Sequence, residues 1–268
     1  MARNGSAYLA VELRDRTGVV KARVFRDADR IAARFERGDA VFVRGRAERF
    51  RGELVAELDD VRRLEPGSYD PGELLPSAYR SIEELEGFLE HLAREIHDPG
   101  LAKAVQRAVF AEPTWTEFKR APCTRAGHHA YLGGLIEHTV AVASLVGEVC
   151  QLHPRLDSDL LMAAAIVHDV GKVREFTYGA EIALSEEGEA LGHLAIGAEI
   201  VGAAAQGLEA SRRLALLGCV LHHHGPEAGA AARAAGGGRS GFPSAEGLAL
   251  YRLNALDASV KGALEHGP

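Results

Sequence analysis

Two strong metal ligands stand side by side at the end of an apolar run in the second half of the chain. They are His168 and Asp169, and the residues before them, 160–167, are all apolar. Other histidines and one more aspartate occupy apolar segments on either side. The full set is His138, His168, Asp169, His193, His223, His224 and Asp257. Any one of them is more typical of a satisfied core or capping residue than of a ligand, so their number and order matter.

A shared metal centre would satisfy this whole set at once. A buried polar group without a partner costs about 1–3 kcal/mol. Imidazole nitrogens and carboxylate oxygens are ligands for Mn²⁺, Fe²⁺, Co²⁺ and Zn²⁺. The three cysteines are dispersed and show no metal-type pairing, which argues against a thiolate-type structural zinc site.

The segments that carry these residues have the periodicity of amphipathic helices. Ser81 and the glutamates after it can form a capping box, and apolar residues then recur every three or four positions as far as Ile96. No convincing strand-like alternation interrupts the later segments, so residues 81–268 are predicted to form an all-α domain. Further helices are expected near 101–111, 134–151, 158–170, 188–206, 211–222 and 244–264.

The first 65 residues instead alternate apolar and polar side chains with period two, as β-strands do. The apolar sets are Leu9, Val11 and Leu13; Val20, Ala22 and Val24; Val41 and Val43; and Leu54, Ala56 and Leu58. This pattern predicts a multidomain chain in which a small all-β OB-type barrel, 1–65, precedes a linker, 66–80. Because the first strand starts close to residue 1, we expect a barrel that is shortened at its N-terminus.

The polar faces of these strands carry aromatic rings interleaved with guanidinium groups. Bases stack on rings while cations follow phosphates, so the pattern favours binding of single-stranded nucleic acid. A second packed face, or contact with the other domain, is the alternative. The residues are Tyr8, Arg23, Phe25, Phe42, Arg44 and Arg46.

Composition and charge narrow the class of protein. Hydrophobic residues make up 47% and charged residues 26%, as in ordinary globular proteins. No apolar stretch approaches the ~20 residues that span a bilayer, so no membrane partner is expected. The unpaired cysteines indicate reduced thiols and a cytoplasmic location. Residues 1–65 carry 15 Lys+Arg against 12 Asp+Glu (+3) and the rest 16 against 26 (−10), which suggests domains with different partners.

The ordered histidine and aspartate series resembles the HD-domain metal-dependent phosphohydrolases, whose name comes from the doublet in HDVGK. Nearly the whole chain resembles the YhaM-type 3′→5′ exoribonucleases, which join an N-terminal OB module to a C-terminal HD domain. The segments HHAYLGGLIEHT, HDVGK, LGHLAIG, HHG and NALDA resemble their HD motifs in the same order. A glycine- and alanine-rich insertion at 229–241 departs from that pattern.

The resemblance implies metal-assisted phosphodiester hydrolysis at two divalent transition-metal ions, most readily Mn²⁺. Asp169 is expected to bridge the ions, because a carboxylate has two oxygens. One site would be completed by His138, His168 and Asp257. The other would be completed by His193, His223 and His224.

Residues around the centre are expected to assist. Lys172 could place its ammonium on the scissile phosphate, with a helix-capping cation as the alternative. Glu137 could orient the first ligand from the outer shell. The loop before the first ligand helix is expected to bind substrate phosphate, with helix capping or packing as the alternative. Its residues, together with a nearby lysine, are Lys119, Arg125, His128, His129 and Tyr131.

The leading functional hypothesis is an exonuclease that trims single-stranded RNA, or single-stranded DNA, from the 3′ end. The alternative is an HD-type hydrolase of free nucleotides or cyclic dinucleotides, whose OB module serves assembly. A non-enzymatic RNA-binding adaptor is disfavoured by the complete ligand series. The metal, the polymer and homo-oligomerisation are left open by the residues alone.

Overall fold

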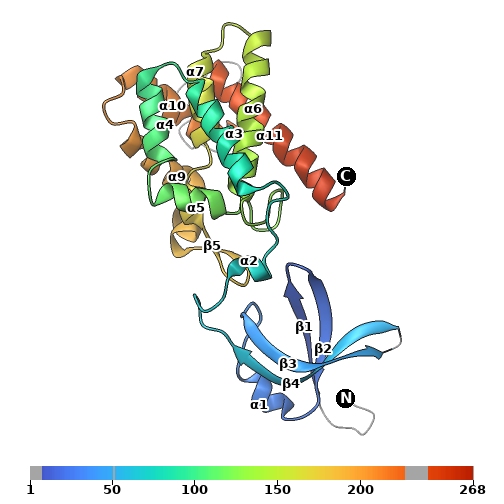
Figure 1. The fold of residues 1–268 in the computed structure, drawn as a ribbon. Helices are drawn as coiled ribbons and strands as arrows, with labels where there is room; N and C mark the ends of the chain where they lie inside the picture. Colours follow the sequence, from blue (N-terminus) through green and yellow to red (C-terminus); the bar gives the residue numbers. More distant parts are fainter. Residues whose placement is uncertain (1–7, 51, 227–240, 268) are drawn as a thin grey trace. The chain divides into compact units, whose positions relative to one another are not determined.

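A computed structural model of the chain describes residues 8–50, 52–226 and 241–267. The predicted insertion at 229–241 lies outside the described residues, except for Gly241. Of the elements that are described, strands occupy the N-terminal part and helices dominate the rest (Figure 1).

The chain divides into two compact units. The first consists of residues 1–77 together with 178–181, and the second of residues 78–177 and 182–268. A short helix, α2 (Pro71–Leu74), lies within the segment that was expected to be a linker. The domain limits inferred from the sequence stay a prediction.

The first unit is a four-stranded sheet with one short helix. Strands β1 and β2 are antiparallel, β2 and β4 parallel, and β3 and β4 antiparallel, so the order is β1-β2-β4-β3. This is an OB-fold whose described strands form an open sheet, which confirms the predicted fold class without a closed barrel. The elements are β1 (Leu9–Asp15), β2 (Gly18–Val24), α1 (Ala28–Ala32), β3 (Val41–Phe50) and β4 (Glu53–Arg63).

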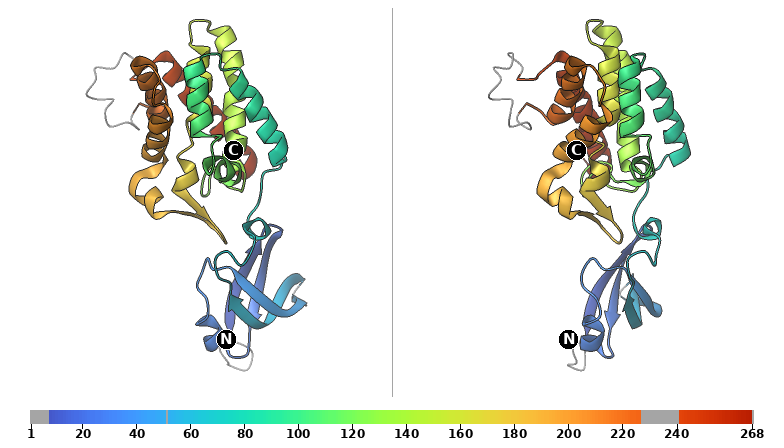
Figure 2. Two further views of the ribbon diagram at one scale, coloured as in Figure 1. Left: turned by 60° about the vertical axis from the view of Figure 1, so that its left-hand side comes forward. Right: turned by 90° about the vertical axis from the view of Figure 1, so that its left-hand side faces the viewer.

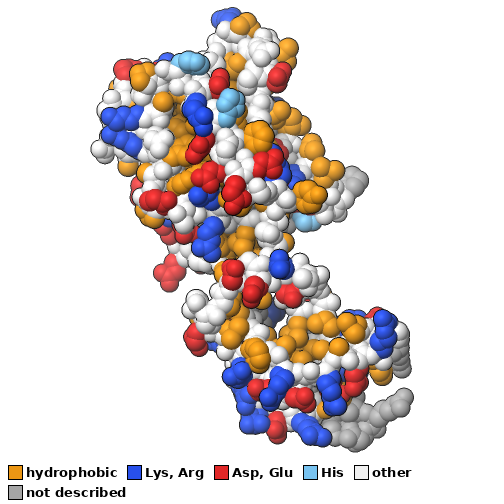
Figure 3. All heavy atoms as spheres, in the orientation of Figure 1, with side chains coloured by type: hydrophobic (Ala, Val, Ile, Leu, Met, Phe, Trp, Pro, Cys, Tyr) orange, Lys and Arg blue, Asp and Glu red, His pale blue; other side chains and the backbone are white. Residues whose placement is uncertain are grey.

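Alternating apolar residues form the core of this unit, as their spacing predicts. The buried members are Ala22, Val24, Ile31, Leu58 and Val61. Leu54 differs from the expectation, because its side chain is 58% exposed. Strand β2 pairs with β4 only at residues 55–57, so Leu54 lies beyond that pairing, beside the β3–β4 turn. Figure 3 shows hydrophobic side chains exposed on this unit, with lysines and arginines around them.

The second unit is a helical bundle that includes most of the residues of two short paired strands, while residues 178–181, at the end of the first of these strands and between the two, belong to the first unit (Figure 2). The hairpin joins β5 (Phe176–Tyr178) to β6 (Ile182–Leu184) and departs from the all-α expectation. Each strand has only three residues, too few for alternation to reveal it. The helices are α3 (Ile82–Arg94), α4 (Pro99–Ala108), α5 (Thr114–Arg120), α6 (Gly134–Leu152), α7 (Ser158–Val167), α8 (Lys172–Glu175), α9 (Glu186–Ala204), α10 (Ala210–His222) and α11 (Ala245–His266).

Helices α6 and α7 lie at the centre of the second unit. Every residue of α7 from Leu160 to Val167 is buried, and the side chain of Asp157 caps its first turn. Helix α6 packs against α3, α7 and α11. By length and composition alone, α6 could cross a membrane. This differs from the expectation that no apolar stretch is long enough to span a bilayer. The buried residues of α6 form the core of the bundle and include His138.

Candidate metal centre

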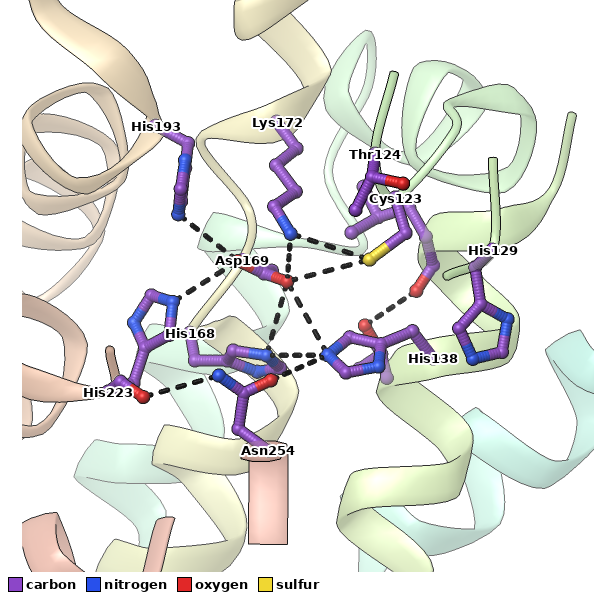
Figure 4. A network of polar contacts seen from close by, with 12 residues as sticks. Cys123, Thr124, His129, His138, His168, Asp169, Lys172, His193, His223 and Asn254 are labelled. Carbon is purple, nitrogen blue, oxygen red and sulfur yellow. Dashed lines mark hydrogen bonds and ion pairs between the residues drawn. The ribbon is translucent and has the colours of Figure 1, made fainter. Parts of the chain in front are cut away.

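The predicted ligands come from helices that pack on one another. His138 lies in α6, and His168 directly follows α7. His193 lies in α9, and His223 directly follows α10. Helices α6, α10 and α11 all pack against α7, and α9 packs against α8 and α10. This packing brings residues that are far apart in the sequence to one place around Asp169 (Figure 4).

Two glycines determine the path of the chain beside the His168–Asp169 doublet. At Gly171 a Cβ atom would lie 2.1 Å from the carbonyl oxygen of His193 and 2.6 Å from the amide nitrogen of Gly197. Only glycine therefore lets this turn pack directly on the backbone of α9. Gly192, at φ 68° and ψ 160°, interrupts α9 just before His193. The break accompanies an approach of His193 Nε2 to within 3.6 Å of Asp169 Oδ1.

The first cluster gathers around one carboxylate oxygen of Asp169, Oδ2. The Nε2 atoms of His168 and His138 lie 3.3 and 3.6 Å from this oxygen and 3.2 Å from each other. The side-chain oxygen of Asn254 lies 3.0 Å from Nε2 of His138. These four residues are buried, and we call them the first cluster.

The second cluster gathers around the other oxygen, Oδ1. The Nε2 atoms of His223 and His193 lie 3.3 and 3.6 Å from it. Nε2 of His224 lies 2.9 Å from Nε2 of His193. His224 is exposed, so this second cluster, Asp169 with His193, His223 and His224, is open to solvent while the first is enclosed.

Hydrogen bonds fix which nitrogen of each ring carries the proton. Nδ1–H of His168 donates to the carbonyl of Ala165 at 2.8 Å, and Nδ1–H of His223 donates to that of Val220 at 2.6 Å. A carbonyl oxygen can only accept, so Nε2 of each neutral ring is left as a lone pair. Both lone pairs face Asp169.

Carboxylates fix the position of the proton on the rings of His138 and His193. Nδ1–H of His138 donates to Oδ2 of Asp257 at 2.6 Å, and Nδ1–H of His193 donates to Oε1 of Glu175 at 2.9 Å. Both clusters therefore consist of electron-pair donors that point at one another with no hydrogen between the fixed rings and Asp169. A cation is what such a convergence needs.

The unsatisfied atoms support the same conclusion. Among the residues that the structure describes, the buried side-chain atoms without a hydrogen-bond partner are Oδ1 of Asp169 and Nε2 of His223. Buried polar groups are nearly always paired, so two orphans 3.3 Å apart indicate a ligand site. The nitrogen and oxygen donors fit divalent transition-metal ions.

The protonation states agree with this assignment. Burial lowers the pKa of His138 to about 4 and that of His223 to about 3, so both rings are neutral at pH 7. Burial alone would raise the pKa of Asp169, but the Lys172 ammonium holds it well below its ordinary value. The ligands are thus in the forms that bind metal.

Lys172 and Cys123 complete the surroundings of Asp169. The Lys172 ammonium lies 2.7 Å from Oδ2 of Asp169 and 3.4 Å from the sulfur of Cys123, so it contacts side chains rather than helix carbonyls. Burial raises the pKa of Cys123 to about 12, which leaves it a neutral thiol. A cysteine 46 residues before Asp169 thus lies beside the centre, although its sequence position did not suggest this.

Asp257 does not join the first cluster as expected. Its Oδ2 contacts Nδ1 of His138, on the opposite edge of that ring from the cluster, and lies 3.0 Å from Nε2 of His129. Nδ1 of His129 lies 2.8 Å from the hydroxyl of Tyr131, which donates to Glu137 at 2.6 Å. These residues hold the His138 ring from behind.

The structure does not bring the five predicted substrate residues together. His129 is 2% exposed, so it does not line an open surface, whereas Tyr131 is half-buried with its hydroxyl bound to Glu137. Lys119 pairs with Glu86 at 3.3 Å. Arg125 is exposed and His128 is half-buried, 3.9 Å from the sulfur of Cys123. Substrate contact by these last two stays a prediction.

The sheet unit carries the predicted aromatic and basic residues on one face. In the strand register Arg23 and Arg46 flank Glu57, and directly paired residues share a face. The rings of Tyr8 and Phe25 are 5.6 Å apart, and the Arg23 guanidinium lies 5.9 Å from the Tyr8 ring. We call this surface, Tyr8, Arg23, Phe25, Phe42, Arg44 and Arg46, the sheet face.

The rings of the sheet face are accessible. Phe25 is 41% exposed and Phe42 is 47% exposed, and the Arg62 guanidinium lies 4.8 Å from the Phe42 ring. Arg44 pairs in register with Asp60, and that carboxylate binds Arg34 at 2.9 Å. Exposed rings beside cations argue against a packed core face within this unit.

Comparison with known proteins gives the same two domains. The family model for the HD domain matches residues 135–259, and that for the OB-fold nucleic acid binding domain matches residues 1–64. No solved structure gives a significant match.

Curated relatives match most of the chain. It is 27% identical over 227 residues to the 3′-5′ exoribonuclease YhaM of Halalkalibacterium halodurans, covering 84% of this chain and 70% of that protein. It is 29% identical over 231 residues to that of Shouchella clausii, covering 84% and 71%. To that of Bacillus subtilis it is 27% identical over 228 residues, covering 84% and 72%. The chain therefore joins an OB-fold nucleic acid binding domain to an HD domain, and over 84% of its length it is similar to the 3′-5′ exoribonucleases YhaM.

Proposed function

We propose that this chain is a metal-dependent 3′→5′ exonuclease that hydrolyses phosphodiester bonds of single-stranded RNA. The observation that carries the proposal is Asp169, whose two oxygens face two different histidine clusters. One carboxylate that serves two ion sites is suited to phosphoryl chemistry. The name of the relatives, 3′-5′ exoribonuclease, supports this reaction and polymer.

The ligands of the two ions would be the first and second clusters. When bound, the ions would lower the pKa of a coordinated water and neutralise charge on the attacking and leaving oxygens. The chain supports this with imidazole rings whose Nδ1–H groups are held by Ala165, Val220, Glu175 and Asp257. Substrate would approach from the side of His224, where the centre is open.

Lys172 has a separate part in the proposal. Burial alone would lower its pKa, but the Asp169 carboxylate raises it above the ordinary value, so the ammonium stays charged. A fixed positive charge beside the bridging carboxylate is suited to a phosphate oxygen of the substrate. The same charge keeps Asp169 ionised.

The identity of the metal, the polymer and the cellular location also belong to this proposal. We propose Mn²⁺ as the working ion, with Fe²⁺, Co²⁺ or Zn²⁺ as alternatives, because the donors are imidazole nitrogens and oxygens. Single-stranded DNA is a second polymer that the sheet face would accept, since every base can stack. We also propose a cytoplasmic location, consistent with three free cysteines. The free-nucleotide alternative is not favoured, because such a substrate has no need of a nucleic-acid-binding domain.

The decisive experiment uses two RNAs of the same sequence. Purified protein with Mn²⁺ should convert a 5′-labelled linear RNA into a ladder of shortened products, while a circular form should resist. Cleavage of the circle would indicate an endonuclease. If both RNAs stay intact while cyclic dinucleotides are hydrolysed, the alternative would replace the proposal.

A further inference from the structure

Asn254 presents its side-chain oxygen to the first cluster. Its amide nitrogen donates to the backbone carbonyl of His223 at 3.2 Å, so its oxygen is the atom 3.0 Å from Nε2 of His138. That nitrogen is a bare lone pair, because Nδ1–H is committed to Asp257. The amide oxygen of Asn254 and the Nε2 lone pair of His138 repel each other unless a cation lies between them.

Asp257, three residues further along α11, cannot take the same place. Its Oδ2 is hydrogen-bonded at 2.6 Å to the opposite nitrogen of the His138 ring. It also faces His129, at 3.0 Å, rather than His168. Its contacts are those of a residue that orients a ligand from behind.

The two clusters share the Asp169 carboxylate, but its two oxygens have different neighbours. The first has a single anionic atom, Oδ2 of Asp169, and the Lys172 ammonium lies 2.7 Å from it. The second has Oδ1 of the same carboxylate, which has no hydrogen-bond partner among the described residues. A cation that binds Oδ2 shares this oxygen with the ammonium, a like charge, whereas among the described residues no hydrogen-bond donor contacts Oδ1.

We propose that Asn254 is the fourth ligand of the first metal site. An amide oxygen where the second cluster has an imidazole, together with the Lys172 ammonium on Oδ2, makes this site the weaker of the two. The inference rests on the two-ion centre proposed above. The second site fills first, and the first site fills only as free divalent metal rises. Activity then follows the metal concentration over the range in which the weaker site loads.

The test is a Mn²⁺ titration of the full chain after removal of metal, followed by calorimetry and by electron paramagnetic resonance of free Mn²⁺. We expect two phases whose dissociation constants differ by about tenfold or more. Asn254→Asp should tighten the weaker phase by about tenfold, through one added charge, and leave the tighter phase unchanged. Asn254→Leu should lose the weaker phase and reduce the stoichiometry from two ions to one.

Two further variants separate the possible ligands. Asp257→Asn retains an acceptor for Nδ1–H of His138, so both phases should persist. Lys172→Gln should increase the Mn²⁺ affinity of the weaker site. This variant tests the asymmetry independently if Asn254→Leu fails to fold. Loss of the weaker phase in Asp257→Asn, with retention in Asn254→Leu, would assign the ligand to Asp257 and overturn the inference.

No RNA is present in these titrations, so their outcome is separate from that of the nuclease assay. Two phases in a protein that leaves RNA intact would uphold the inference and overturn only the proposed substrate. Two ions bound with equal affinity would overturn the asymmetry. Failure to bind Mn²⁺ at all would overturn the inference and the choice of Mn²⁺ as the working ion, while the nuclease assay tests the reaction separately.

Discussion

The helical unit and the sheet unit would contact the same substrate with different kinds of side chain, buried and hydrogen-bonded in the first and exposed in the second. Around Asp169 the residues of the first cluster are buried, and each fixed ring has its second nitrogen committed to an acceptor. On the sheet face the rings are exposed, and the arginines stand beside carboxylates in the register. Chemistry at a phosphate needs fixed atoms, whereas sequence-tolerant binding can use mobile ones.

The same contrast applies to salt. Charges on the sheet face are screened by ions within about 10 Å at 0.1 M salt, while the buried pair of Lys172 and Asp169 is screened much less. We therefore expect substitutions in the helical unit to change metal content and rate, and substitutions in the sheet to change affinity and its salt dependence.

The largest effect is expected at the bridging carboxylate. Asp169→Ala should lose most of the bound metal and reduce RNA hydrolysis by about a thousandfold or more, because both clusters lose their shared oxygen donor. Elemental analysis and a ladder assay measure the two effects. His222→Ala is the matched control, since Nδ1 of this neighbouring histidine bonds to the carbonyl of Gly218 at 2.8 Å rather than to Asp169, and the variant should retain full metal. Unchanged metal in Asp169→Ala would refute the bridging role.

A smaller effect is expected one contact away from the ions. Glu175→Gln should weaken metal binding by about 10- to 100-fold, because the amide holds the ring of His193 less firmly than the carboxylate does. Glu187→Gln is the control, since Glu187 pairs with Arg174 and does not contact His193. Equal metal affinity in the two variants would mean that the orientation of His193 does not depend on Glu175.

A smaller effect still is expected on the sheet face. Phe42→Ala should weaken binding of single-stranded RNA by about 1–3 kcal/mol through lost base stacking, without change in metal content. Phe88→Ala is the control, because Phe88 is also about half exposed and has an arginine, Arg80, 4.7 Å from its ring, but lies on α3. Equal losses in both would show that the sheet face has no special part in binding.

The smallest effect is expected from a single arginine of that face. Arg44→Ala should reduce the slope of log affinity against log salt by less than one, since each phosphate neutralised on a single strand contributes about 0.7. Arg94→Ala, which removes an exposed arginine paired with Glu90 on α3, should leave the slope as it is. A slope that is the same in both variants would remove Arg44 from the RNA contact.

Much of the fold follows from periodicity. The alternation of Val41 and Val43 predicted a strand, and the apolar run before His168 predicted a buried helix, because burial on one face or all round leaves those patterns. The exposure of Leu54 and the hairpin of β5 and β6 could not be predicted. They depend on where a neighbouring strand stops pairing and on segments of three residues.

The candidate site shows a similar limit. The clustering of the histidines around Asp169 could be predicted, because each residue lies in an apolar helix or at the end of one. Asn254 and Asp257 are three residues apart on one helix, so spacing alone puts both near the same face. Only the edge of the His138 ring that each contacts distinguishes them. Cys123 could not be predicted, because it lies in a loop and no sequence pattern indicates that this loop contacts Asp169 and Lys172.

The backbone contact at Gly171 has a consequence for how this centre could change during evolution. The turn after the doublet touches the carbonyl of His193 directly, so the separation between Asp169 and His193 is determined by main-chain atoms. Exchange of any single ligand side chain could then alter metal preference while the separation between Asp169 and His193 stays constant. A side chain at residue 171 would instead push α9 away and move His193 from Asp169, which would alter the second cluster as a whole.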